Sequence, residues 1–195
     1  IVVENGDVYR APTVIVTAGG TPVKLNVPGE VEYAGKGVSY CAICDGAFYK
    51  GHTILVVGGG DAALEEADFL TRYAEKVYLV HRRDSFRASK IVQQRAFANP
   101  KIQVITDTVV DEVVGKDGLM THAKIRNVKT GAASDLVATG IFIFIGFTPN
   151  TGMIKEHVAH DSAGYLITDA NMQTSVPGLF AAGAGTHFEH HVLAV

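Results

Sequence analysis

The sequence contains few cysteines, little net charge and no long uninterrupted apolar run. Its 195 residues include only two cysteines, and the formal net charge is −3. This balance gives no electrostatic reason to expect a nucleic-acid partner. The apolar stretch 136–147 is shorter than a membrane span and is interrupted by Thr139 and Gly140. The first residues lack the pattern of a signal peptide. We therefore expect neither a nucleic-acid nor a membrane partner.

The two cysteines stand close together, in the segment Cys41-Ala42-Ile43-Cys44-Asp45. Two thiols at this spacing can close a small disulfide ring, and each can be attacked by the other. A zinc site is one alternative, but structural zinc needs four ligands and the sequence has no second cysteine pair. A purely structural disulfide is another alternative, although so short a loop adds little stabilisation. The pair therefore favours redox chemistry.

A dinucleotide-binding pattern follows the cysteine pair. Residues 52–57 are typical of a buried strand, and residues 62–73 indicate a helix. Between them, Gly58 allows a tight turn, Gly60 lets a pyrophosphate approach the backbone, and Ala63 lets the helix pack closely on the strand. The free N–H groups of the helix N-terminus would face the phosphates. Next to the dithiol, this pattern predicts pyridine-nucleotide-driven disulfide chemistry in a reducing, cytoplasmic compartment.

Several positively charged residues follow directly after the next predicted strand. The strand at 76–80 runs into His81-Arg82-Arg83, and Arg87 follows one helical turn later. An NAD site usually carries an acidic residue here, which binds the ribose 2′-hydroxyl. Guanidinium groups suit a 2′-phosphate instead, so the sequence predicts NADPH rather than NADH. The alternative is an ordinary solvated basic surface.

Strand and helix patterns alternate through the middle of the chain. After the first strand and helix, the sequence predicts a strand at 76–80, a helix at 88–96, a strand at 102–106, an antiparallel meander at 109–114, 123–128 and 136–138, and a closing strand at 140–145. This order indicates the α/β class and a Rossmann-like three-layer domain. We expect that domain at 39–147, with partial segments of another domain at 1–38 and 148–195.

Six stretches form an ordered set: 37–46 (GVSYCAICDG), 56–63 (VVGGGDAA), 65–67 (EEA), 81–88 (HRRDSFRA), 145–150 (IGFTPN) and 173–183 (QTSVPGLFAAG). In this order and spacing they resemble the low-molecular-weight thioredoxin reductases of the bacterial and archaeal type, within the class II pyridine nucleotide-disulfide oxidoreductases. The resemblance covers nearly the whole chain. It implies an NADPH-binding domain and, at 1–38 and 148–195, partial segments of an FAD-binding domain.

The resemblance also implies residue roles. Cys44 would lie against the flavin and receive its electrons, Cys41 would attack the disulfide of thioredoxin or a similar small protein, and Asp45 would handle the proton. Electrons would pass from NADPH through FAD to the dithiol, in a homodimer. The residues expected to hold NADPH are Gly58, Gly59, Gly60, Asp61, Ala62, Ala63, His81, Arg82, Arg83, Arg87 and Gly146.

Some family features are missing or altered. The 195 residues contain no second glycine-rich turn of this kind, Gly183 is followed by Ala184 instead of aspartate, and His190-His191 replace an Arg-Gln pair. We therefore expect FAD in the intact protein but not in this chain alone, which we expect to bind NADPH without reducing thioredoxin by itself. At His187, His190 and His191 we expect local divergence and no metal site.

Two other functions fit the same motifs. The chain could belong to the reductase component of a peroxiredoxin system, which shares them. It could also be a non-catalytic NADPH-binding module with idle cysteines. A flavin absorbance band in the purified protein would favour an enzyme over the module.

Overall fold

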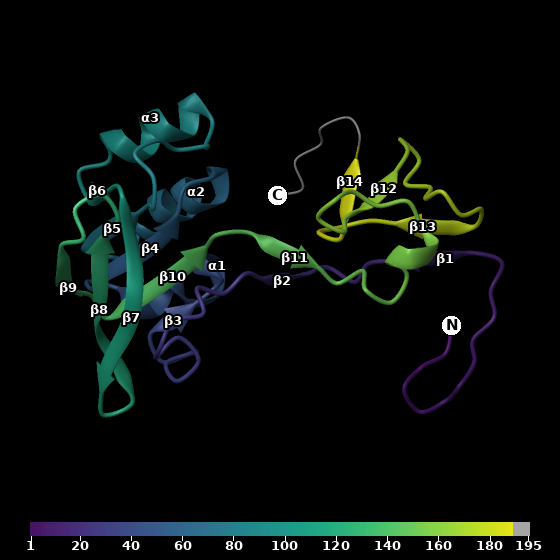
Figure 1. The fold of residues 1–195 in the computed structure, drawn as a ribbon, viewed down its shortest axis with the longest axis horizontal. Helices are drawn as coiled ribbons and strands as arrows, with labels where there is room; N and C mark the ends of the chain where they lie inside the picture. The colour runs from purple at the N-terminus through teal and green to yellow at the C-terminus, as the bar shows by residue number, and fades with distance from the viewer. Residues whose placement is uncertain (189–195) are drawn as a thin grey trace. The chain divides into compact units, whose positions relative to one another are not determined.

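The structure is a computed structural model that describes residues 1–188. The chain divides into two compact units, which are described separately. The central unit comprises residues 22–146, and the outer unit comprises residues 1–21 together with the chain from residue 147 onward (Figure 1). No helix among the described residues is long and apolar enough to cross a membrane.

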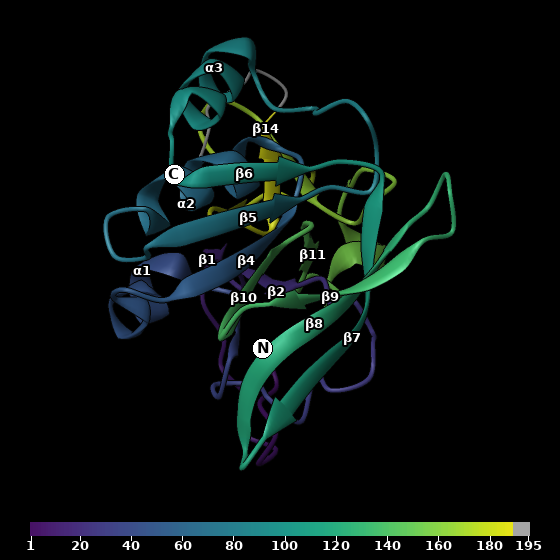
Figure 2. The same ribbon diagram turned by 90° about the vertical axis from the view of Figure 1, so that its left-hand side faces the viewer.

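The central unit is built on a parallel sheet of five strands. Their order is β3 (Val38–Ser39), β10 (Gly140–Phe144), β4 (Thr53–Gly58), β5 (Lys76–Val80) and β6 (Ile102–Ile105). Figure 2 shows β6, β5, β4 and β10 in succession. The helices of this unit are α1 (Ala42–Asp45), the 3-10 helix η1 (Gly46–Tyr49), α2 (Asp61–Leu70) and α3 (Lys90–Ala98).

Both faces of this sheet are buried, because successive side chains along a strand belong in turn to two different hydrophobic clusters. On β4, Ile54 and Val56 pack against α2 and α3, whereas Leu55 and Val57 face the opposite side. That side is covered by an antiparallel sheet of β7 (Thr108–Lys116), β8 (Leu119–Asn127) and β9 (Ala133–Val137). Burial on both faces explains the nearly continuous apolar runs of the strands. The three-layer α/β prediction is confirmed.

Helix α2 forms because one face is apolar at helical spacing. Ala63, Leu64, Ala67 and Leu70 are all fully buried against the sheet. The helix ends at Leu70, three residues earlier than the sequence predicts. There the N–H and hydroxyl of Thr71 both donate to the Asp68 carbonyl, at 3.2 and 2.6 Å, which tightens the last turn.

The structure places the first boundary between units at 21/22, whereas the sequence expectation was 38/39. Residues 22–38 belong to the central unit because they contribute to its core. Tyr33 and Val38 are buried in the cluster beneath the antiparallel sheet, and Leu25 and Val27 pack against it. The second boundary, at 146/147, differs from the expectation by one residue.

A buried carboxylate shapes this same segment. Glu30 is 1% exposed, and its two oxygens accept hydrogen bonds from the backbone N–H groups of Leu25 and Asn26 at 2.9 and 2.6 Å. The Tyr40 hydroxyl donates a third hydrogen bond, at 2.7 Å. Burial, followed by this contact with Glu30, raises the pKa of Tyr40. Glu30 therefore ties the segment before the cysteines to the loop at 24–26.

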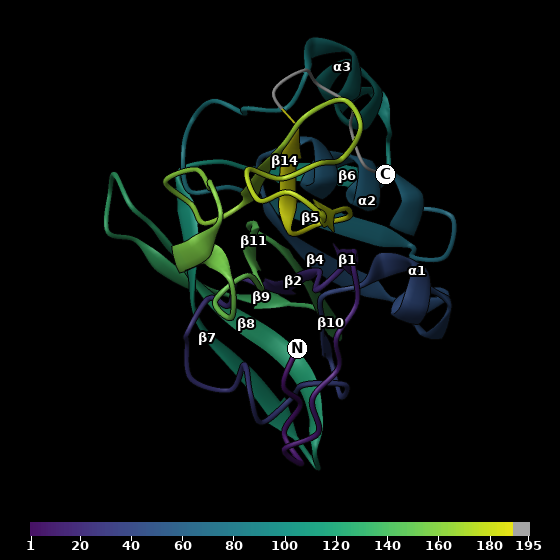
Figure 3. The same ribbon diagram turned by 90° about the vertical axis from the view of Figure 1, so that its right-hand side faces the viewer.

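The outer unit consists mainly of short paired strands. β1 (Val14–Val16) pairs with β13 (Leu179–Ala181), β12 (Leu166–Thr168) pairs with β14 (Thr186–Phe188), and β2 (Gly20–Pro22) pairs with β11 (Phe147–Pro149). Its small core contains Val158, Leu166 and Ala181. The described part of this unit has one 3-10 helix, η2 (Lys155–His157), and no α-helix. Figure 3 shows the strands of this unit, with β14 in yellow.

Candidate functional site

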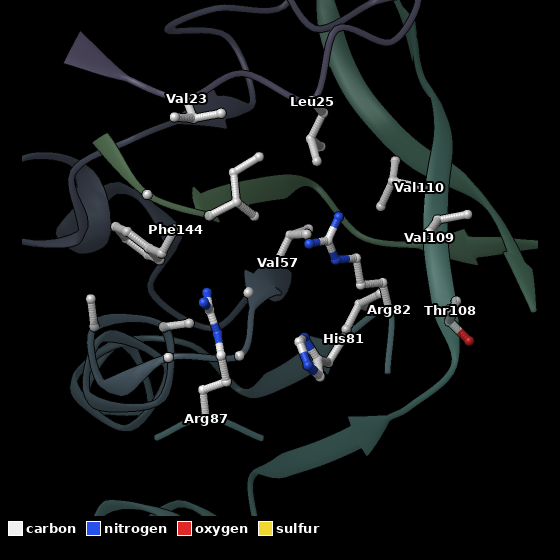
Figure 4. Close-up of a pocket in the computed structure, with 18 of the residues that line it drawn as sticks. Val23, Leu25, Val57, His81, Arg82, Arg87, Thr108, Val109, Val110 and Phe144 are labelled. Carbon is white, nitrogen blue, oxygen red and sulfur yellow. The ribbon is translucent and has the colours of Figure 1, made fainter. Parts of the chain in front are cut away.

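A cavity of about 660 Å³ lies in the central unit. It opens beyond the carboxyl ends of β4, β5 and β10, where α2 begins, and Figure 4 shows its side chains. Ligands of open parallel sheets bind at this edge. The predicted cofactor-binding residues that line it are Gly58, Gly59, Gly60, Asp61, Ala62, Ala63, His81, Arg82, Arg87 and Gly146.

The glycine turn is crowded on one side and open on the other. Gly58 has φ of +154°, and a Cβ there would collide with the Phe144 carbonyl. A Cβ at Gly59 would collide with the His81 ring. At Gly60, the N-cap of α2, an added Cβ would meet no atom within 4 Å. The first two glycines are thus required by the fold, and the third leaves room at the helix N-terminus.

The segment carrying Arg87 is fixed to this turn through its backbone. The N–H groups of Arg87 and Ala88 donate to the Gly59 carbonyl at 2.9 and 3.2 Å, and the Ser89 N–H donates to Asp61 Oδ1 at 2.8 Å. The bond from Ser89 is the main cause of the lowered pKa of Asp61. Asp61 lines the cavity, but its carboxylate oxygen Oδ1 is engaged by Ser89.

His81 forms part of the cavity wall. Its ring is largely buried, stacks on Phe86 with the ring centroids 4.8 Å apart, and contacts the Ser85 carbonyl through Nε2 at 3.1 Å. Burial lowers the pKa of His81, and the positive charges of Arg82, Arg83 and Arg87 lower it further. A neutral imidazole therefore presents a flat wall at neutral pH.

The structure separates the three predicted arginines. The guanidinium groups of Arg82 and Arg87 reach toward the middle of the cavity, with His81 between them and Leu25 across from them (Figure 4). Arg83 is not among the lining residues. Its carbonyl accepts a hydrogen bond from the Asp107 N–H at 3.2 Å. Two cationic side chains in one cavity with a free helix N-terminus make an anion site.

The dithiol lies in the same unit but outside the cavity. Cys41 and Cys44 form a disulfide. Cys41 is the N-cap of α1, and the Cys44 N–H donates to Cys41 Sγ at 3.2 Å. Asp45 Oδ2 accepts a 2.6 Å hydrogen bond from the Ser39 hydroxyl. None of these residues lines the cavity. The lining residues therefore do not bring a bound ligand into contact with the two sulfur atoms.

Sequence reasoning did not identify two groups. Lys24 lines the cavity with its neighbours Val23 and Leu25, and no local motif marks this segment as part of a binding site. Ser39 lies within the stretch 37–46 that contains both cysteines, yet only the folded geometry reveals its hydrogen bond to Asp45.

No group of three or more histidine, cysteine, aspartate or glutamate side chains within residues 1–188 could hold a metal ion. His190 and His191 lie outside the described residues. Only the backbone of His187 is described, as part of β14.

Comparisons with known proteins agree on one family. The pyridine nucleotide-disulphide oxidoreductase family matches residues 1–195. The thioredoxin reductase of Streptomyces coelicolor is 51% identical over 91% of this chain and 55% of its own length. That of Listeria monocytogenes is 46% identical over 90% of this chain and 55% of its own.

Solved structures give the same result. The crystal structure of Lactococcus lactis thioredoxin reductase matches with a TM-score of 0.82 and 44% identity, over 92% of this chain and 59% of that one. The chain thus spans little more than half the length of the relatives it matches. The chain belongs to the pyridine nucleotide-disulphide oxidoreductase family.

Proposed function

We propose that this chain is the part of a thioredoxin reductase that binds NADPH and carries the redox dithiol. The observation that carries the proposal is that one compact unit holds both a glycine-turn cavity with two arginines and a Cys-x-x-Cys disulfide beside a carboxylate. Relatives that share 46–51% of its residues are thioredoxin reductases. Following the resemblance, we further propose that the whole protein is a cytoplasmic homodimer.

NADPH fits the cavity residue by residue. The pyrophosphate would lie over the open side of Gly60, at the N-terminus of α2. Arg82 and Arg87 would hold the 2′-phosphate, and the neutral His81 ring would form a wall. We assign Arg83 a weaker part, because it does not line the cavity. When bound, NADPH supplies a hydride, and the protein supplies position and charge.

Replacing Gly60 with alanine is expected to weaken NADPH binding without lowering stability. The new methyl group meets no protein atom within 4 Å, and φ of −96° suits alanine. It would instead occupy space that a pyrophosphate needs. We expect the dissociation constant, measured by calorimetry, to rise roughly tenfold, equivalent to about 1.4 kcal/mol. The melting temperature should stay unchanged.

Gly152→Ala is the matched control for this variant. Gly152 also has open space around its Cβ position, but it lies in the outer unit. Neither affinity nor melting temperature should change in the control. An unchanged NADPH affinity in the Gly60→Ala chain would show that no phosphate lies over this turn.

The family also implies FAD. The central unit contains one strand–glycine-turn–helix element at β4 and α2, and the described part of the outer unit has no α-helix that could provide another. The described residues therefore do not form a second pyrophosphate site of this kind. We propose FAD as a cofactor of the whole protein, and we assign it no contact here.

The dithiol can exchange electrons with a protein disulfide. In the reduced chain, a Cys41 thiolate would keep the hydrogen bond from the Cys44 N–H, which stabilises the anion. It attacks one sulfur of the substrate disulfide, forms a mixed disulfide and displaces one thiolate. Cys44 then attacks Cys41 Sγ, restores the Cys41–Cys44 disulfide and releases the second thiolate. Asp45 accepts the proton of an attacking thiol and returns it to a departing thiolate.

An exposed apolar surface beside the disulfide suits a protein substrate. Ile43 is 75% exposed within α1, and Phe48 is 79% exposed in the adjoining η1. Aromatic residues, phenylalanine included, are enriched at protein–protein interfaces relative to the rest of the surface. We propose that these two side chains contact oxidised thioredoxin.

A Phe48→Ser substitution tests the docking surface. It should slow exchange between the chemically reduced chain and oxidised thioredoxin about tenfold, the effect of losing roughly 1.4 kcal/mol of buried contact. Exchange with hydroxyethyl disulfide, which needs no docking surface, should keep its rate. Rapid acid quenching and mass spectrometry measure both reactions. Equal rates with thioredoxin in the wild-type and Phe48→Ser chains would exclude Phe48 from the contact.

A further inference from the structure

Ser39 has a side chain next to the dithiol that the mechanism above does not use. It ends β3 and is 4% exposed. Its hydroxyl oxygen lies 2.6 Å from Asp45 Oδ2, 3.1 Å from the Cys41 nitrogen and 3.3 Å from the Cys41 carbonyl oxygen. One buried hydroxyl therefore contacts both the carboxylate and the backbone of the first cysteine.

The hydroxyl has more partners than it can use at one time. A serine hydroxyl donates one hydrogen bond and accepts two. With Asp45 ionised, Ser39 donates to the carboxylate, since a charged acceptor at 2.6 Å outcompetes a neutral carbonyl at 3.3 Å. It simultaneously accepts from the Cys41 N–H. The Cys41 carbonyl is then left without this donor.

Protonating Asp45 reverses the direction of one bond. The new carboxyl O–H can donate to Ser39 Oγ across the same contact. The Ser39 hydrogen then rotates toward the Cys41 carbonyl, which is already within reach, while the bond from the Cys41 N–H stays in place. The contact between Ser39 and Asp45 thus remains a hydrogen bond in both states of Asp45, with rotation of one hydroxyl and no movement of heavy atoms.

We propose that Ser39 is a positioning residue whose hydroxyl rotates between two acceptors as Asp45 gains and loses the exchange proton. The proposal rests on the role of Asp45 in the proposed function. In each thiol–disulfide exchange step, one sulfur–sulfur bond breaks as another forms, and the electrons stay with the sulfur atoms. The proton moves from the attacking thiol to Asp45, and later from Asp45 to the departing thiolate. Ser39 carries no net proton.

The backbone around Ser39 is well placed for this role. Val38 and Ser39 pair with Ile141 and Phe142 of β10, both fully buried. The Ile141 N–H also donates to the Gly37 carbonyl at 2.7 Å. The hydroxyl is therefore held by the edge strand of the five-stranded sheet, so Asp45 is hydrogen-bonded to a side chain on a paired strand and not on a loop.

A double-mutant cycle with the full chain tests the proposal. The chain is reduced chemically, mixed with oxidised thioredoxin and quenched with acid, and the exchange rate is read by mass spectrometry. Asp45→Asn removes the proton carrier and should slow exchange about a hundredfold. Ser39→Ala removes the hydroxyl and should slow it about tenfold. The double variant should be no slower than Asp45→Asn alone, because Ser39 acts through Asp45.

Three outcomes would overturn the proposal. If Ser39→Ala slows exchange by the same factor in the Asp45→Asn background as in the wild-type background, the serine acts on the fold and not on the carboxylate. If Ser39→Ala keeps the wild-type rate, the hydroxyl is dispensable. If Asp45→Asn itself keeps the rate, the acid/base assignment of the proposed function fails, a result distinguishable from the other two.

Two controls separate positioning from folding. Ser39→Thr and Ser39→Val have nearly the same shape and differ in the hydroxyl, so only the valine variant should be slow. Equal rates for the two would contradict the proposal even if Ser39→Ala failed to fold. Ser134→Ala, at an exposed serine on β9, should keep the wild-type rate. NADPH affinity should stay constant across the series, which shows that each variant is folded.

Discussion

Replacing Arg82 and Arg87 together with alanine is expected to weaken NADPH binding about a hundredfold and to leave NADH binding nearly unchanged. Both guanidinium groups reach toward the middle of the cavity (Figure 4). A hydrogen bond to a charged group contributes about 1.5–3 kcal/mol, and we take the lower figure because both side chains are exposed. Two such losses total about 3 kcal/mol, or two decades in affinity. Titration calorimetry with each nucleotide measures the ratio.

Two further variants sharpen this prediction. Arg83→Ala should lower NADPH affinity less than Arg82→Ala does, because Arg83 does not line the cavity. Arg10→Ala removes one positive charge from the outer unit and should change neither affinity. Equal weakening of NADPH and NADH by the Arg82/Arg87 pair would contradict the 2′-phosphate assignment and leave the arginines as a general basic surface.

Substituting either cysteine is expected to abolish complete disulfide transfer, with different products. In the Cys44→Ser chain, Cys41 can still attack oxidised thioredoxin, but no second thiol resolves the product, so a mixed disulfide should accumulate. The Cys41→Ser chain should accumulate far less of it, because the remaining thiol lacks the 3.2 Å backbone hydrogen bond that Cys41 Sγ accepts. Non-reducing electrophoresis and peptide mapping identify the linked residues.

The reverse pattern would contradict the assignment of the two thiols. A mixed disulfide that forms through Cys44 and not through Cys41 would make Cys44 the attacking residue. A double Cys41→Ser/Cys44→Ser chain, which should keep its NADPH affinity, controls for non-covalent association with thioredoxin. Stoichiometric zinc with both thiols protected from alkylation would remove the redox interpretation altogether.

The sequence predicts the central unit well because periodicity and turn chemistry act locally there. The strand at 76–80 matches β5 residue for residue, and the predicted meander corresponds to β7, β8 and β9. The glycine turn and the arginines line one cavity, apart from Arg83. Strand ends bring these motifs together by the ordinary topology of parallel sheets, so their spacing in the sequence is informative.

The boundary near residue 22 was not predictable in the same way. Residues 23–37, between β2 and β3, have no regular secondary structure, and the membership of this segment in the central unit depends on long-range burial of Tyr33 and Val38. The Glu30 carboxylate, which would ordinarily be expected at the surface, is instead satisfied by three donors within the fold. Lys24, which directly precedes the Leu25 N–H bound by Glu30, lines the cavity.

Fine geometry at the dithiol also required the folded chain. The sequence places Ser39, Cys41 and Asp45 close together, but it does not reveal which side chains meet. The hydrogen bond between Ser39 and Asp45 spans six residues and depends on the turn from β3 into α1. Such a contact follows from backbone direction, which residue types alone do not determine.

The most direct test of the central claim is a count of thiols after one exchange. The chemically reduced chain is mixed with excess oxidised thioredoxin, quenched with acid, alkylated and analysed by mass spectrometry. We predict that the chain loses both thiols and regains the Cys41–Cys44 disulfide, while thioredoxin gains two thiols for each chain oxidised. Retention of both thiols on the chain, with thioredoxin still oxidised, would contradict a disulfide reductase function for this dithiol.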